Sequence, residues 1–122
     1  MFGISAFSLH ICKEMISILL GMPKIYEYFG FIFFFFSNEH EPIHVHVIKA
    51  GNQTVFDLIL MNGELVDIKR RVEHGYIPLG EKDATVAETF IKAYYRNIVE
   101  KWKNFFVLKK QVRCTQITKK VK

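Results

Sequence analysis

Cysteine pairs and the common short catalytic motifs are missing from this chain. Only two of its 122 residues are cysteines, Cys12 and Cys114, and they form no Cys-x-x-Cys pair. This spacing supports neither a disulfide framework nor a zinc-knuckle site, and it favours a reducing cytoplasm. The chain also lacks a Gly-rich phosphate loop, a nucleophile elbow and an internal repeat. Its function therefore has to be inferred from other patterns.

Long apolar runs are missing as well. The longest aromatic run, residues 29–36, is only strand-sized, whereas a helix that spans a bilayer needs about 20 apolar residues. Residues 1–21 resemble an export signal weakly, but Lys13 and Glu14 interrupt the apolar stretch and no basic region precedes it. We therefore expect neither export nor a membrane partner.

The composition fits one folded domain. Half of the residues are hydrophobic and 15% are aromatic, which excludes disorder for most of the chain. A domain of this size folds without disulfides or metal. Any bound metal would therefore have a functional role and would not be needed for folding. We expect residues 22–108 to form one α+β domain, residues 1–21 to be an extension outside its core with Met22 as the natural start, and residues 109–122 to be a basic tail.

Short strands are expected after Met22, at about residues 24–29, 31–36, 43–49, 54–61 and 64–69. The loops between them are short, which favours a small antiparallel meander of four to five strands. Asn62-Gly63 is the clearest turn signal, because a type I′ turn needs a positive φ at both positions. This turn places Met61 opposite Glu64.

The preceding hairpin can be registered by pairing Lys49 with Thr54 across residues 50–53. His46 then lies opposite Asp57, and His44 lies opposite Ile59. One face of this hairpin would carry the apolar residues Val45, Val47, Phe56 and Leu58, and the other would carry His44, His46, Ile48, Val55, Asp57 and Ile59.

Residues 84–108 have the period of one long C-terminal helix packed on the sheet. Its apolar stripe is Ala87, Phe90, Ile91, Tyr94, Ile98, Trp102 and Phe105. Thr85 and Glu88 could form a capping box, with Asp83 as a competing N-cap. A flexible loop over residues 70–82 would lead into this helix. Because strand 31–36 is apolar on both sides, its second face implies a homodimer, a small protein partner or the N-terminal segment.

Three of the five histidines lie within residues 40–46. His44 and His46 share one face of a strand, and His40 could approach from the turn. These three imidazoles with an open position would suit a divalent metal such as zinc, with Asp57 as a fourth ligand or as a partner of a ligand. Such a metal would acidify a bound water for hydrolysis.

The same residues allow other roles. Without metal, His46 and Asp57 could act as an oriented general base. The histidines could also bind a ligand or partner without chemistry, or they could hold the turn through hydrogen bonds to Asp57, Glu39 or Glu41.

Positive charge is concentrated at the C-terminal end. Residues 99–122 carry eight Lys or Arg and a single acid, Glu100. Contact with RNA, DNA or an acidic partner would use Lys101, Lys103, Lys109, Lys110, Arg113, Lys119 and Lys120. The alternative is a solvated, partly frayed tail. Trp102 lies on the apolar stripe and is expected in the core instead of stacking on bases.

Several motifs resemble the small bacterial proteins catalogued as domain of unknown function 4160. They are Met22-Pro23-Lys24-Ile25, Phe29-Gly30 before the aromatic strand, the stretch from Ser37 to His46, and a terminal helix with Trp102 and Phe105-Phe106. The resemblance covers residues 22 to about 108, and Ile43 replaces a proline that many relatives have. It implies a cytoplasmic protein in a toxin–antitoxin-like two-gene system.

These observations predict a binding or interaction module in such a system. The alternative is a small metal-dependent hydrolase or ribonuclease that uses His40, His44, His46 and Asp57.

Overall fold

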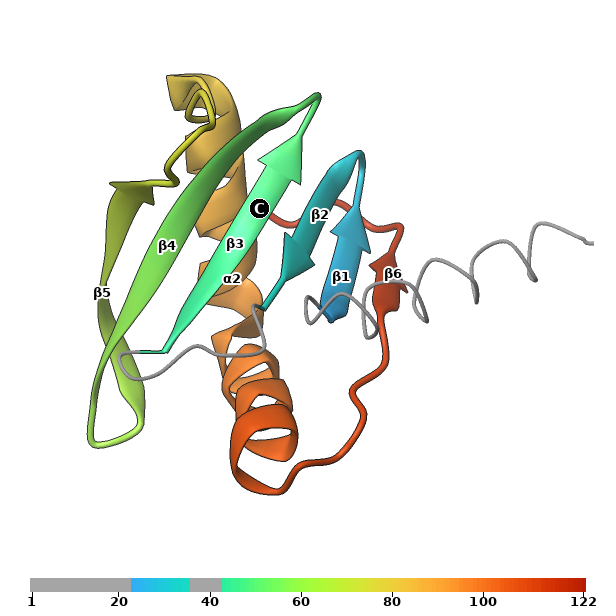
Figure 1. Ribbon diagram of the computed structural model, residues 1–122. Helices are drawn as coiled ribbons and strands as arrows, with labels where there is room; N and C mark the ends of the chain where they lie inside the picture. Colours follow the sequence, from blue (N-terminus) through green and yellow to red (C-terminus); the bar gives the residue numbers. More distant parts are fainter. Residues whose placement is uncertain (1–22, 36–42) are drawn as a thin grey trace, which may run out of the picture.

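A mixed sheet with one long helix on one face forms the fold (Figure 1). The computed structural model describes residues 23–35 and 43–122. The strands are β1 (Lys24–Tyr28), β2 (Phe31–Phe34), β3 (His44–Lys49), β4 (Asn52–Met61), β5 (Glu64–Val72) and β6 (Thr115–Ile117). Helix α2 (Glu81–Trp102) continues into a π-helical turn, η1 (Lys103–Val107). The α+β class is confirmed, but the described residues form six strands instead of four to five.

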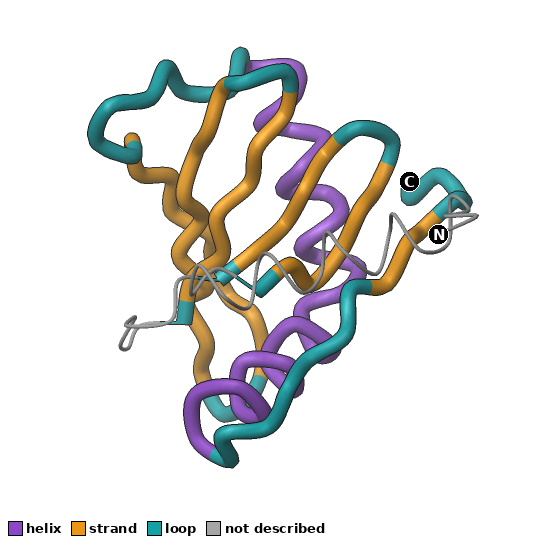
Figure 2. The backbone as a smooth tube through the Cα atoms, turned by 45° about the vertical axis from the view of Figure 1, so that its right-hand side comes forward, coloured by secondary structure: helices purple, strands orange, loops and turns teal. Residues whose placement is uncertain are grey.

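The strand order is β5-β4-β3-β2-β1-β6. The first five strands form the predicted antiparallel meander. Strand β6 adds a parallel pairing to β1, with Tyr26 opposite Thr115. Figure 2 shows the connection that leads from the end of the helix back to this edge of the sheet. The sequence did not predict this strand, because it is only three residues long and its position depends on the path of the chain after the helix.

All three two-residue turns between the described strands use the left-handed conformation, and at Phe29-Gly30 between β1 and β2 the φ values are 44° and 86°. Asn62 and Gly63 have φ values of 53° and 81°, and Met61 pairs with Glu64 as predicted. Between β3 and β4 the turn is Ala50-Gly51, with φ values of 51° and 87°.

The shorter turn between β3 and β4 changes the register. Lys49 pairs with Asn52 instead of Thr54, so every partner on β4 is two residues away from the prediction. His44 is therefore opposite Asp57, and Val55 is opposite His46. Because a shift of two residues keeps each side chain on its face, the predicted division of the hairpin into two faces is unaffected.

Helix α2 begins at Glu81, three residues before the predicted start. Gly80 is the N-cap and makes no side-chain capping bond, so the predicted capping box and the Asp83 cap are wrong. The hydroxyl of Thr85 instead donates to Glu81 Oε2 over 3.2 Å. The preceding loop is tied to β4, because the backbone N–H of Leu79 donates to Thr54 Oγ1 over 2.9 Å.

The expected flexible loop over residues 70–82 is shorter in the structure, because Arg70, Arg71 and Val72 belong to β5. The guanidinium of Arg70 then binds the start of the helix, with Nη1 2.9 Å from Glu81 Oε1 and Nε 2.6 Å from Glu88 Oε2. The side chains of β5 and the first turns of α2 are thus joined by an ion-pair network.

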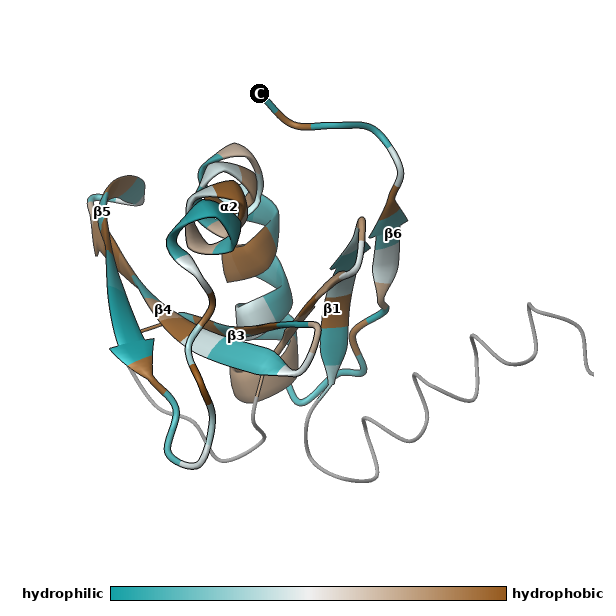
Figure 3. Cartoon of the chain, turned by 90° about the horizontal axis from the view of Figure 1, so that it is seen from above, coloured by the Kyte–Doolittle hydropathy of each residue, from teal (hydrophilic) through white to brown (hydrophobic). Residues whose placement is uncertain are grey.

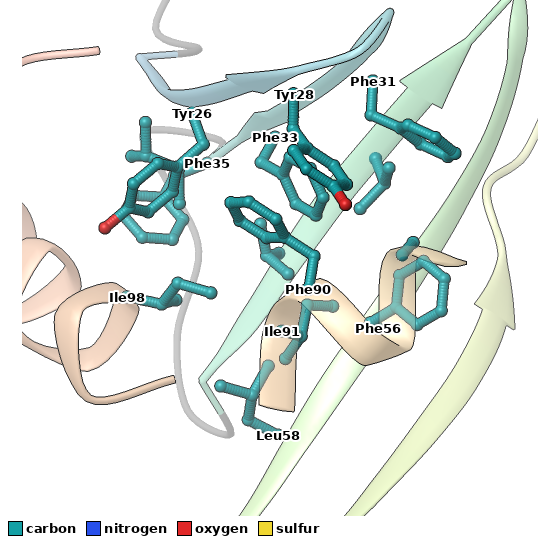
Figure 4. Packing of buried hydrophobic residues seen from close by; sticks show 14 of the residues in the cluster. Tyr26, Tyr28, Phe31, Phe33, Phe35, Phe56, Leu58, Phe90, Ile91 and Ile98 are labelled. Carbon is teal, nitrogen blue, oxygen red and sulfur yellow. The ribbon is translucent and has the colours of Figure 1, made fainter. Parts of the chain in front are cut away.

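Aromatic side chains fill the space between the sheet and the helix (Figure 4). The ring of Phe90 on α2 lies 4.5 Å from the ring of Phe33 and 4.6 Å from that of Tyr28. Trp102 is 7% exposed, which confirms its assignment to the core. Figure 3 shows α2 between the two flanking strands β5 and β6, so one face of the sheet is concave around the helix. The other face presents the histidines of β3.

Candidate functional site

The outer face of β3 and β4 carries a row of polar side chains. His44, His46 and Gln53 are 7%, 2% and 1% exposed. The two imidazole rings lie 5.5 Å apart, centre to centre. This confirms that the His-x-His pair shares one face, as the alternation of a strand requires. The face also carries Asp57, which pairs with His44 across the two strands.

The carboxylate of Asp57 is bound by Arg71 from the neighbouring strand β5. Arg71 Nε lies 3.0 Å from Oδ1 and 2.9 Å from Oδ2, and Nη2 lies 2.9 Å from Oδ1. Both carboxylate oxygens are therefore engaged by one guanidinium, in the fork geometry that arginine favours with carboxylates. The negative charge of Asp57 is therefore compensated by the guanidinium of Arg71 on the same sheet.

His46 has a different polar environment from the one predicted. Its Nδ1 lies 3.1 Å from Gln53 Nε2 and 3.7 Å from Glu73 Oε1, and its ring stacks on Phe34 at 5.2 Å. When Gln53 donates to Nδ1, the ring proton has to be on Nε2. The predicted His46/Asp57 pair is not formed across the strands, because the register brings Val55 opposite His46.

Glu73 is the residue near His46 that sequence reasoning missed. It follows β5 directly, and β5 is three residues longer than predicted. Residues 69–72 are Lys-Arg-Arg-Val and do not alternate apolar with polar side chains, so no sequence pattern could have extended the strand and brought Glu73 beside the start of β4.

The predicted metal site combines His44 and His46 with His40. Residues 39–41, including His40, lie outside the described part of the chain. Within the described ranges, no three His, Cys, Asp or Glu side chains are grouped so that they could hold a metal ion. His44 and His46 are near one another, and Asp57 is bound to Arg71.

The basic C-terminal segment, residues 103–122, is a second candidate site. It contains no Asp or Glu and seven basic residues, in a chain whose net charge is +5. All seven are exposed: Lys103, Lys109, Lys110, Arg113, Lys119, Lys120 and Lys122. The rest of the chain carries ten Lys or Arg against twelve Asp or Glu, so the net positive charge of the protein comes from this segment.

The structure attaches the basic C-terminal segment to the sheet. Strand β6 pairs with β1, and Val112 and Cys114 before it are 6% and 9% exposed. Beyond it, the backbone N–H of Val121 donates to the Tyr28 hydroxyl over 3.0 Å. Residues 112–121, which include Arg113, Lys119 and Lys120, are therefore held at the β1 edge of the sheet.

Lys101, the first residue of the predicted basic contact, lies in a different environment. Its ammonium donates to the carbonyls of Ile25 at 3.0 Å and Arg113 at 2.6 Å, and to Thr115 Oγ1 at 3.0 Å. The structure places this lysine between the helix, β1 and the segment that leads to β6, where it holds the fold together.

One family comparison gives a match. The sequence model of a family described as Domain of unknown function (DUF4160) matches residues 30–103, more than half of the chain. No curated protein and no solved structure matches the chain. In the described part of the chain, no helix is long and apolar enough to cross a membrane.

Proposed function

Since the chain belongs to the DUF4160 family, whose description states no activity, we propose its function from its own surfaces: it is a binding module that holds nucleic acid on the basic C-terminal segment. We place it in the cytoplasm, because two cysteines that form no Cys-x-x-Cys pattern in the sequence suit a reducing compartment. The toxin–antitoxin-like two-gene setting is part of the proposal and comes from the family resemblance.

One observation carries the proposal, namely seven exposed basic side chains without an acidic residue on a segment attached to the sheet. Lysine and arginine that neutralise phosphates release condensed counterions, which makes binding strong at low salt and weak at high salt. An attached segment also loses less conformational entropy on binding than a frayed tail does. These contacts position a phosphate backbone without reading its sequence.

The test replaces Lys109, Lys119 and Lys120 together by glutamine. We expect the affinity for RNA or DNA, measured by fluorescence anisotropy, to fall at least about tenfold at low salt and its dependence on salt to become shallower. The matched control replaces three exposed lysines elsewhere, Lys69, Lys82 and Lys92, by glutamine.

The control lowers the net charge by the same amount as the test variant. If both triple variants lost the same affinity, binding would be a general charge effect and the basic C-terminal segment would not be the site. Neutralisation is preferable to removal of the segment after Leu108, because removal would also take Val112 and Cys114 from the core.

A second function, metal-dependent hydrolysis, is favoured by the two adjacent imidazoles of His44 and His46 on one face of β3. Elemental analysis of the natively purified protein tests it, compared with the His44→Ala/His46→Ala double variant. Stoichiometric metal that disappears in the variant would support the hydrolase. A binding module is expected to purify without it.

The homodimer or small protein partner expected from the sequence stays a prediction. Strand β5 ends the sheet on one side, and its Val66 and Val72 are 55% and 66% exposed. Such an edge could accept a strand from a second chain. Sedimentation equilibrium of the wild type gives the oligomeric state directly.

A further inference from the structure

The end of the long helix closes into a compact turn, which we call the helix tip (residues 103–110). The backbone N–H of Leu108 donates to the Lys103 carbonyl over 3.0 Å, and that of Lys110 donates to the Asn104 carbonyl over 2.7 Å. These two bonds hold the chain that leaves the helix against the last helical turn. Figures 1 and 2 both show the helix tip at one extremity of the molecule, at the bottom of the view. A flat surface can therefore approach it.

One side of the helix tip is anchored in the core. The Phe106 ring lies 5.0 Å from the Trp102 ring and 5.7 Å from the Phe35 ring, centre to centre. The next two residues, Val107 and Leu108, are 61% and 55% exposed. Single exposed aliphatic side chains are common on protein surfaces, but here two consecutive ones lie on a projecting turn. The helix tip thus presents a fixed aliphatic pair to its surroundings.

Lysines flank this aliphatic pair. Lys103 precedes it, Lys109 and Lys110 follow it, and all three are exposed. The chain contains no Asp or Glu after Glu100, so no acidic residue of the helix tip or of the segment after it offsets this charge. A partner that fits the helix tip must therefore accept aliphatic side chains and carry negative charge around them.

We propose that the helix tip binds the surface of an anionic lipid bilayer. Val107 and Leu108 enter the boundary between headgroups and acyl chains, and Lys103, Lys109 and Lys110 contact the anionic headgroups. Peripheral proteins combine apolar insertion with the attraction of basic residues to headgroups, two weak signals that together give reversible membrane binding. The expectation of no membrane partner followed from the lack of a spanning segment, which a surface contact does not require.

A bilayer suits this surface better than a nucleic acid does. A phosphate backbone attracts lysines but offers no apolar phase that would remove two aliphatic side chains from water. The boundary region of an anionic bilayer offers both. The inference is therefore independent of the proposed nucleic-acid binding, although Lys109 belongs to both surfaces. The cytoplasmic leaflet of the membrane carries the anionic lipids, which agrees with the proposed compartment.

The first experiment measures binding of the full chain to vesicles by sedimentation. Vesicles of phosphatidylcholine with about 30% phosphatidylserine are compared with vesicles of phosphatidylcholine alone. Wild type is expected to bind the anionic vesicles at least about tenfold more tightly, because each lysine near the surface adds roughly a factor of five. High salt should reduce this difference. No binding to anionic vesicles would overturn the proposal and leave the helix tip to an acidic protein partner.

Val107→Ser/Leu108→Ser removes the aliphatic pair and keeps every charge. Its affinity for anionic vesicles should fall by about ten- to hundredfold, while its affinity for RNA or DNA should be unchanged. The matched control, Val72→Ser/Ile77→Ser, removes the same number of carbon atoms from side chains that are 66% and 71% exposed. The control should bind vesicles like wild type. Equal losses in the two double variants would show that the helix tip is not the contact.

Two further variants test each part of the contact. Leu108→Trp should bind anionic vesicles at least as tightly as wild type, because tryptophan is favoured at the membrane interface. Its fluorescence should shift to shorter wavelength on binding, relative to wild type with Trp102 alone. Lys103→Gln/Lys110→Gln should lose affinity for anionic vesicles by about twentyfold and change little towards neutral ones.

The remaining outcomes would contradict the proposal. If Leu108→Trp bound vesicles without a change in its emission, the aliphatic pair would not enter the bilayer. If Val107→Ser/Leu108→Ser lost affinity for nucleic acid and kept its affinity for vesicles, the pair would belong to the nucleic-acid surface. Either result would overturn the membrane contact of the helix tip and leave the proposed nucleic-acid binding in place.

Discussion

The ammonium of Lys101 lies 4.5 Å from the centre of the Tyr26 ring while it donates hydrogen bonds to backbone on both sides of the β1–β6 pairing. One side chain of the helix thus joins the meander to the last strand of the sheet. Strand β6, which attaches the basic C-terminal segment to the sheet, depends on this contact, because it has only three residues and, among the described strands, pairs only with β1.

We expect Lys101→Met to reduce the free energy of unfolding by about 2 kcal/mol, since hydrogen bonds from a charged donor are lost together with a cation–π contact. Hydrogen exchange of the amides of β6 should accelerate more than that of β4. Lys103→Met, two residues further on an exposed site, is the control and should change neither quantity. Equal effects of the two substitutions would contradict the structural role of Lys101.

Tyr26 should make stability depend on alkaline pH. Burial, with a smaller effect of Tyr94, raises the pKa of Tyr26 from 10.0 to about 12. The folded state therefore holds this phenolic proton more tightly than the unfolded state. The resulting contribution of Tyr26 to the free energy of unfolding is fully present below pH 10 and is lost as the pH rises from 10 towards 12. Thermal unfolding as a function of pH should show a shallower alkaline decline in Tyr26→Phe than in wild type.

Ala50 offers a stabilising substitution. It has a φ of 51° in the β3–β4 turn, a conformation that is costly for alanine and well tolerated by asparagine. Ala50→Asn should raise the free energy of unfolding by about 0.5–1 kcal/mol. Ala50→Val, with a β-branched side chain, should lower it. Urea denaturation of the three proteins checks the order.

His46 and Asp57 should differ in their effects on stability. His46→Ala empties a nearly fully buried position and leaves Gln53 Nε2 without its partner, which should cost about 2–3 kcal/mol. Asp57→Asn weakens an ion pair with the half-exposed Arg71 and should cost less than about 1 kcal/mol. Chemical denaturation gives both values, and a larger loss for Asp57→Asn would show that the acid, not His46, stabilises this face.

Which side chains share a face could be read from the sequence. Val45, Val47, Phe56 and Leu58 lie in the core on one side of the β3–β4 hairpin, and His44, His46 and Asp57 lie on the other, as predicted. The stripe from Ala87 to Trp102 likewise packs against the sheet. These features follow from periods of two and of 3.6 residues, which are properties of the local chain.

The sequence alone determined the α+β class, the meander and the two faces of the hairpin that carries the histidines. Only the tertiary structure decided that His44 faces Asp57, that Glu73 approaches His46, and that Lys101 supports β6. A register shift of two residues preserves the alternation of side chains, so the pattern cannot detect it. Contacts between distant residues depend on the path of the whole chain, and the lengths of β5 and of the turn at Ala50 set that path.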